Sequence, residues 1–125
     1  FSTGGYGAVG SFYGCSSLTG IDIPEGVTGI GNKSFMYCES LTEVTIPNTV
    51  TRVGAHCFYQ CYGITGINIG SGLTETDTNA FAHCYALTEI NIPDTLIKLG
   101  SSSFGCSLLL PNTQLDSINF GSGLE

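Results

Sequence analysis

Hydrophobic positions recur along this chain with a period of 23 residues. The period separates five phenylalanines, Phe12, Phe35, Phe58, Phe81 and Phe104. Cysteines keep the same spacing at Cys15, Cys38, Cys61 and Cys84, with Cys106 following 22 residues later. Two aliphatic series also keep it, namely Ile21, Val44, Ile67, Ile90 and Ile23, Ile46, Ile69, Ile92. Series that stay in phase in so short a chain indicate an internal repeat, in which stacked units bury apolar side chains that one unit could not bury alone.

Each unit contains one segment that is typical of a short β-strand. At 41–46 the sequence reads LTEVTI, so Val44 and Ile46 face one side while Glu43 and Thr45 face the other. A proline follows and ends the strand, because it has no N–H for the ladder. The same pattern predicts strands at 18–23, 64–69, 87–92 and 115–120.

The rest of the unit returns the chain to the next strand. Short strands near 27–30 and 50–53 predict a second sheet, and Gly54 then turns the chain. Phe58 and Cys61 are three residues apart, which places them on one side of a single helical turn. The predicted fold is a right-handed solenoid of about five coils, mainly β with a parallel sheet and short helical turns. Its expected interior includes Phe35, Phe58, Phe81, Leu41, Leu87, Ile46, Ile69 and Ile92.

Departures from the repeat suggest how the chain is organised. We interpret residues 1–125 as one solenoid segment, with a divergent glycine-rich lead-in over 1–11 and a loop insertion over 107–114. The last repeat breaks off in mid-unit, so we expect the segment to belong to a larger protein. Thr76 and Asp77 replace the hydrophobe–glycine pair of other units, and we expect looser packing there.

Composition narrows the classes of partner. Apolar residues make up 42% of the chain, which is enough to build a core. The net charge is −7 with only three basic residues, so a nucleic-acid partner is not expected, because phosphate neutralisation needs Lys and Arg. No apolar run approaches the roughly 20 residues of a membrane span, so we expect no membrane insertion.

The repeat resembles the BspA-type leucine-rich repeat family of bacterial and protozoan surface proteins. The matching stretches are 15–31, 35–54, 58–73 and 81–100, with an L-T-x-I-x-I-P strand and an F-x-x-C turn. The resemblance implies a leucine-rich-repeat stack in a secreted or surface-attached protein that acts in adhesion or host binding. It offers no catalytic residues to carry over.

Six cysteines raise the question of disulfides or zinc. The sequence has no C-x-x-C, and His56 and His83 lie in different coils, which argues against a tetrahedral zinc site. The periodic cysteines occupy equivalent positions whose side chains point in parallel, so we expect reduced, buried thiols with no metal and no cofactor. Cys57 occupies a small-residue position, and its oxidation with Cys61 stays open as an alternative.

No catalytic constellation converges in this sequence, and we expect no enzyme activity. His56 adjoins Cys57, but neighbours on a turn point apart. Glu43 and Glu89 share one strand column and lie two coils apart, about 9.6 Å from the strand spacing. They would stand on an open surface, whereas glycoside hydrolysis needs two carboxylates in a cleft.

Two surfaces remain as candidates for binding. The first is formed by outward strand positions around Glu43, Thr45, Asn68, Glu89 and Asn91. The second is a ledge of two tyrosines, Tyr62 and Tyr85, in equivalent positions of neighbouring coils, since exposed tyrosines suit sugars or proteins.

The expected function is a non-enzymatic extracellular binding or adhesion module whose partner is a protein or glycan on a host or neighbouring cell. The alternative is a structural segment of a longer surface fibre, in which copies of the chain stack end to end through exposed strand edges. An ice-binding function is disfavoured, because the single threonine column is flanked by acidic residues.

Overall fold

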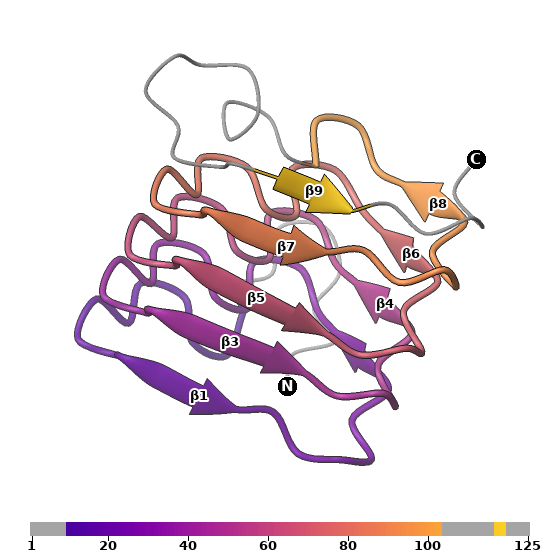
Figure 1. Cartoon of the computed structure of the whole chain (residues 1–125). Helices are drawn as coiled ribbons and strands as arrows, with labels where there is room; N and C mark the ends of the chain where they lie inside the picture. The colour runs from indigo at the N-terminus through magenta and orange to yellow at the C-terminus, as the bar shows by residue number, and fades with distance from the viewer. Residues whose placement is uncertain (1–9, 104–116, 120–125) are drawn as a thin grey trace.

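The computed structural model describes residues 10–103 and 117–119. The chain forms a right-handed solenoid in which two parallel sheets share the coils (Figure 1). Sheet A contains β1 (Gly20–Asp22), β3 (Glu43–Ile46), β5 (Gly66–Ile69), β7 (Glu89–Asn91) and β9 (Ser117–Asn119), in that order. Sheet B contains β2 (Gly29–Ile30), β4 (Arg52–Val53), β6 (Glu75–Thr76) and β8 (Lys98–Leu99). Both predicted sheets and the repeat are thereby confirmed.

The strands pair in the register that the 23-residue period requires. Val44 lies opposite Ile67, which lies opposite Ile90, so equivalent residues of successive coils are direct neighbours. The strands of sheet A begin later than predicted, as β3 starts at Glu43 and not at Leu41. The reason is local, because the Leu41 N–H donates to the Cys38 carbonyl and closes the preceding turn.

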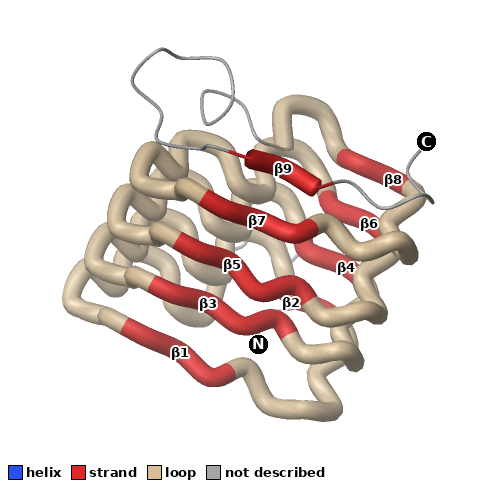
Figure 2. The backbone as a smooth tube through the Cα atoms, in the orientation of Figure 1, coloured by secondary structure: helices blue, strands red, loops and turns tan. Residues whose placement is uncertain are grey.

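The predicted helical turn is instead a run of tight turns, and the described residues contain no helix (Figure 2). The Met36 N–H donates to Lys33 O, and the Cys38 N–H donates to Phe35 O. Lys33 and Tyr37 have φ values of 58° and 64°, in the left-handed region that an α-helix excludes. The Phe35 N–H donates to Cys57 O of the next coil, at 2.9 Å, and so takes no part in a helical bond.

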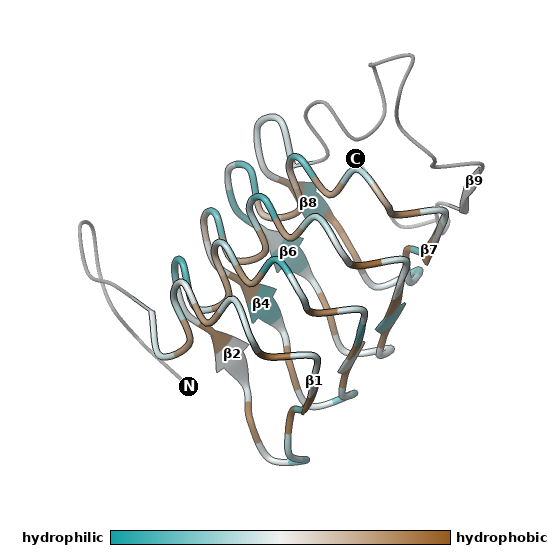
Figure 3. Cartoon of the chain, turned by 90° about the vertical axis from the view of Figure 1, so that its left-hand side faces the viewer, coloured by the Kyte–Doolittle hydropathy of each residue, from teal (hydrophilic) through white to brown (hydrophobic). Residues whose placement is uncertain are grey.

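A column of stacked phenylalanine rings forms the centre of the core. Ring centroids are 5.2 Å apart for Phe12–Phe35, 5.1 Å for Phe35–Phe58 and 5.5 Å for Phe58–Phe81, with nearly parallel planes. Hydrophobic stretches recur at the same place in successive coils (Figure 3). The other residues predicted to be interior are also buried, except that Ile69 is half-buried against the core: Leu41, Leu87, Ile46 and Ile92.

Polar side chains add further bonds between coils. The Thr42 hydroxyl donates to Thr19 O at 3.2 Å, and Thr65 and Thr88 repeat this bond one coil further each time. On another edge, Asn32 Oδ1 accepts the Ala55 N–H at 2.8 Å. The threonine hydroxyls add a second bond to carbonyls that already accept a backbone N–H, whereas Asn32 supplies a side-chain partner to the Ala55 N–H in a turn.

The packing at Thr76 is not looser, contrary to our expectation. Thr76 is 2% exposed, and its hydroxyl lies 3.2 Å from the Ser103 hydroxyl. The Gly100 N–H also donates to it. A buried hydroxyl with partners avoids the cost of desolvation, so this coil replaces an apolar contact by hydrogen bonds.

Part of the predicted organisation lies outside the described residues. Of the lead-in over 1–11, only Gly10 and Ser11 are described, and the insertion over 107–114 lies outside altogether, as do Phe104 and Cys106.

The phenylalanine column generates a first prediction. Phe58→Ala should lower the free energy of unfolding by about 3–5 kcal/mol, because the ring is fully buried between two others. Equilibrium unfolding in urea measures it. Ile97→Ala is the control, because Ile97 is 54% exposed and should change the free energy by no more than about 0.5 kcal/mol. Equal losses in the two variants would contradict the packing described.

Close approach of neighbouring coils generates a second prediction. A Cβ at Gly54 would lie 2.5 Å from Asn32 Oδ1 and 2.6 Å from the Asn32 nitrogen, whereas a Cβ at Gly66 would meet nothing within 4 Å. Gly54→Ala should therefore cost about 1–3 kcal/mol of unfolding free energy. Gly66→Ala should cost nothing or stabilise by about 0.5 kcal/mol. Thermal unfolding compares them, and a Gly54→Ala protein as stable as Gly66→Ala would refute the close approach.

Candidate binding surfaces

The first predicted surface lies on the outer side of sheet A, and we call it the strand face: Glu43, Thr45, Asn68, Glu89 and Asn91. Glu43 and Thr45 alternate along β3 with the buried Val44 and Ile46, as the pleat requires. Register places Thr45 beside Asn68, and Gly66 between Glu43 and Glu89. The side chains of Glu43, Thr45, Asn68 and Asn91 are exposed. The structure thus brings the predicted residues onto one face.

Polar groups meet on the strand face. The Asn68 amide donates to Glu43 Oε1 at 3.3 Å across neighbouring coils. Thr45 and Asn68 also border a shallow hollow of about 280 Å³, whose other walls include Glu25, Pro47 and Asn48. Amide, hydroxyl and carboxylate groups beside a proline ring can hydrogen-bond a partner.

The second predicted surface is the Tyr62–Tyr85 ledge. The two rings stack with centroids 5.5 Å apart and planes within 5°. Tyr62 is 39% exposed, whereas Tyr85 is half-buried and its hydroxyl is hydrogen-bonded to His83 Nδ1. The His83 ring in turn lies edge-on to Tyr59, 5.0 Å away. The ledge is therefore the exposed end of a larger group of aromatic rings, with Tyr62 presented to solvent.

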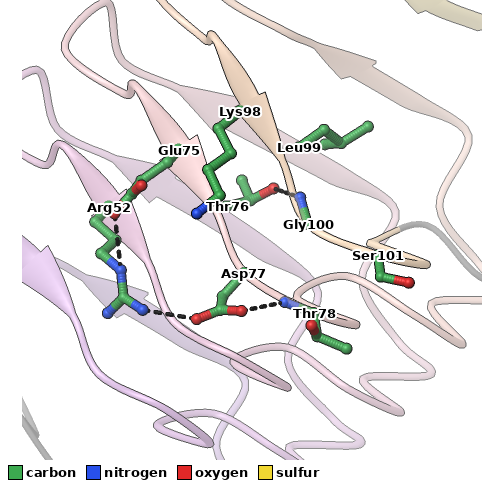
Figure 4. Close-up of a pocket in the computed structure, with 9 residues that line it drawn as sticks. All are labelled: Arg52, Glu75, Thr76, Asp77, Thr78, Lys98, Leu99, Gly100 and Ser101. Carbon is green, nitrogen blue, oxygen red and sulfur yellow. Dashed lines mark hydrogen bonds and ion pairs between the residues drawn. The ribbon is translucent and has the colours of Figure 1, made fainter. Parts of the chain in front are cut away.

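Sequence reasoning missed a third surface, a charged hollow over sheet B. The hollow has a volume of about 340 Å³ (Figure 4) and is lined by Arg52, Glu75, Thr76, Asp77, Thr78, Lys98, Leu99, Gly100 and Ser101. Arg52 Nε lies 2.9 Å from Glu75 Oε1, and Arg52 Nη2 lies 2.6 Å from Asp77 Oδ2. One feature of the sequence could have indicated this hollow. It is the replacement of the hydrophobe–glycine pair by Thr76 and Asp77, from which we expected only looser packing.

The cysteines form a structural ladder. The Cys38, Cys61 and Cys84 thiols each donate to a phenylalanine carbonyl of the preceding coil, at 3.1, 3.1 and 3.2 Å. Burial raises the pKa of Cys38 to about 11 and that of Cys84 to about 12. The same cause raises the pKa values of Cys57 and Cys61 further. All described cysteines are free thiols, and protonated thiols are poor nucleophiles.

Within 10–103 and 117–119, no three His, Cys, Asp or Glu side chains are placed to hold a metal ion. Across the same residues there is no helix of the length and hydrophobicity that crossing a bilayer requires.

Coils of this period, with a parallel sheet on one side and F-x-x-C turns, define a leucine-rich-repeat solenoid. Residues 8–125 match the family model described as the BspA type leucine rich repeat region, in six copies. The chain therefore belongs to the BspA-type leucine-rich repeat family. No curated protein matches it.

Solved structures of bacterial leucine-rich repeat proteins are similar to this chain. The T. pallidum leucine-rich repeat protein is 26% identical, with a TM-score of 0.71, over 84% of this chain and 47% of that one. A leucine-rich cell surface protein of Faecalibacterium prausnitzii is 26% identical, with a TM-score of 0.62, over 86% and 34%. A leucine-rich repeat protein of Bacteroides capillosus is 25% identical, with a TM-score of 0.58, over 86% and 75%. The chain spans less than half the length of the first two.

The thiol ladder generates a third prediction. The intact mass should be the same with and without reductant, because each ladder thiol is buried and directed at a carbonyl and not at another sulfur. A thiol reagent should label these cysteines slowly in the native protein and completely in guanidinium, which serves as the control. A non-reduced mass that is lighter by two hydrogens per bridge would contradict the ladder.

Proposed function

We propose that this chain is a non-enzymatic binding or adhesion module of an extracellular repeat protein. The observation that carries the proposal is a contrast within sheet A. Inward positions repeat as Val44, Ile67 and Ile90, whereas the outward positions beside them change from coil to coil. A scaffold that holds its core constant and varies its outer side chains is the usual basis of recognition by solenoids.

The strand face is also suited to binding by its rigidity. Each of its strands is paired on both sides within sheet A, and its buried neighbours are close-packed. Side chains held by such a frame lose little conformational entropy on binding, so modest contacts can give useful affinity. Its amide, hydroxyl and carboxylate groups favour a protein or glycan partner on a host or neighbouring cell.

Family membership supports a place at the cell surface. The Faecalibacterium prausnitzii protein, which is similar to this chain, is described as a leucine-rich cell surface protein. The Tyr62–Tyr85 ledge is the second candidate surface, because an exposed aromatic ring gives a large contact area for a protein or a sugar.

A binding assay with surface variants tests the proposal. The probes are an array of immobilised glycans and extracellular-matrix proteins. Glu43→Lys with Glu89→Lys alters the strand face, and Tyr62→Ser with Tyr85→Ser alters the ledge. For a probe that the unaltered chain binds, one of the two double variants should have an affinity lower by about tenfold or more, since the binding energy of an interface concentrates in a few residues. The strand-face variant should leave the unfolding free energy nearly unchanged, because its two positions alternate with the buried residues of sheet A. The ledge variant should lower the unfolding free energy, because Tyr85 is half-buried, and should still unfold in one cooperative transition.

For a probe that the strand-face variant no longer binds, the control is Glu39→Lys with Asp94→Lys, which makes the same change in net charge at exposed positions outside the strand face. It should bind as the unaltered chain does. Unchanged binding by both test variants would remove these surfaces. Sedimentation that shows concentration-dependent association, together with such a result, would favour a structural segment stacked end to end in a surface fibre.

A further inference from the structure

The charged hollow over sheet B gathers most of the positive charge of this chain. The sequence has only three Lys and Arg residues against ten acidic ones, and two of the three, Arg52 and Lys98, line this one hollow. Glu75 and Asp77 line it as well, so the four charged side chains sum to zero. The chain as a whole has a net charge of −7 and repels anions. At this hollow the local charges cancel, so an anionic ligand is not repelled there.

The hollow is built where the repeat departs from its own rule. Neighbouring coils have a hydrophobe followed by glycine, as at Val53-Gly54 and Leu99-Gly100, but this coil has Thr76-Asp77. The buried Thr76 hydroxyl needs Ser103 and the Gly100 N–H as partners to be tolerated. Local exceptions of this kind, with a compensating network beneath them, are expected at functional sites.

The charged side chains of the hollow differ in how they are held. Arg52, Glu75 and Asp77 are fixed by ion pairs with one another, whereas Lys98 is not. Arg52 bridges Glu75 and Asp77, and Asp77 Oδ1 also accepts the Thr78 N–H at 2.7 Å. Lys98 lies beside Glu75 in the register of sheet B and extends across β6 (Figure 4). Among residues 10–103 and 117–119, Lys98 forms no ion pair, so its ammonium group is available to a ligand.

We propose that this hollow binds a carboxylate-bearing sugar, such as a hexuronate residue of a glycan. The Lys98 ammonium pairs with the ligand carboxylate as a charge-assisted hydrogen bond. The fixed Asp77 carboxylate and the Thr78 and Ser101 hydroxyls hydrogen-bond the ring hydroxyls. The volume of about 340 Å³ lies at the small end of ligand sites, which span about 300–1,000 Å³, and suits one sugar ring.

This site goes beyond the proposed function, because it lies on sheet B and the strand face lies on sheet A. Loss of one therefore leaves the other in place. A glycan bound here would be recognised through ionic and hydroxyl contacts, without the aromatic stacking that the Tyr62–Tyr85 ledge offers.

Amide chemical shifts of the isotope-labelled chain test the proposal in three titrations, with methyl glucuronide, methyl glucoside and acetate. Glucuronide should shift amides of 75–78 and 98–101 and bind at least about tenfold more tightly than either of the others, the size expected of one charge-assisted bond. Added salt should weaken it. Lys98→Gln should lower the glucuronide affinity by at least about tenfold with no change in melting temperature.

Lys33→Gln is the matched control, because it removes the same charge from a turn outside the hollow and should leave the affinity unchanged. Acetate that binds as tightly as glucuronide would reduce the hollow to a simple anion site and overturn the proposal. Equal binding of glucoside, full affinity in Lys98→Gln, or no shift at 75–78 and 98–101 would overturn it too.

Discussion

The structure depends on one constraint, which is that the backbone groups of each coil find their partners in the neighbouring coil. The Phe35 N–H bonds Cys57 O, and the Thr65 N–H bonds Thr42 O, so both the turns and the sheets are closed between coils. Buried backbone groups must be paired, a single short strand cannot pair its own, and the tight turns pair only some of theirs internally. The spacing of 23 residues is therefore a condition of folding and not only a pattern in the sequence.

Side-chain ladders follow from that constraint, because equivalent residues come to lie one above another. Stacked phenylalanines fill the centre, thiols bond the carbonyls beside them, and threonines bond along the edge of sheet A. Glycine appears where coils approach each other closely, as at Gly54. Since the inward residues carry the stability, the outward residues are free to vary. The strand face and the charged hollow lie on the outer sides of the two sheets, and the Tyr62–Tyr85 ledge lies on the turns.

The sequence predicted what periodicity can encode and missed what depends on local geometry. Strand positions, the inward alternation of Val44 and Ile46 and the strand face follow from spacing alone. The left-handed turns did not, because Lys33 and Tyr37 are not residues typical of positive φ. The charged hollow was missed for another reason. The period does place Glu75, 23 positions after Arg52, beside it in sheet B, but the second ion pair of Arg52 with Asp77 and the hollow itself depend on side-chain positions that the period does not encode.

Deletion of a whole coil tests the central claim most directly. Removing residues 39–61 takes out one full period and should leave a shorter solenoid with a strand-rich circular dichroism spectrum and one cooperative unfolding transition. Removing only 39–50 takes out fewer residues but joins a turn to sheet B out of phase, so it should leave the chain unfolded. The account would be contradicted if the half-coil deletion folded as stably as the whole-coil deletion.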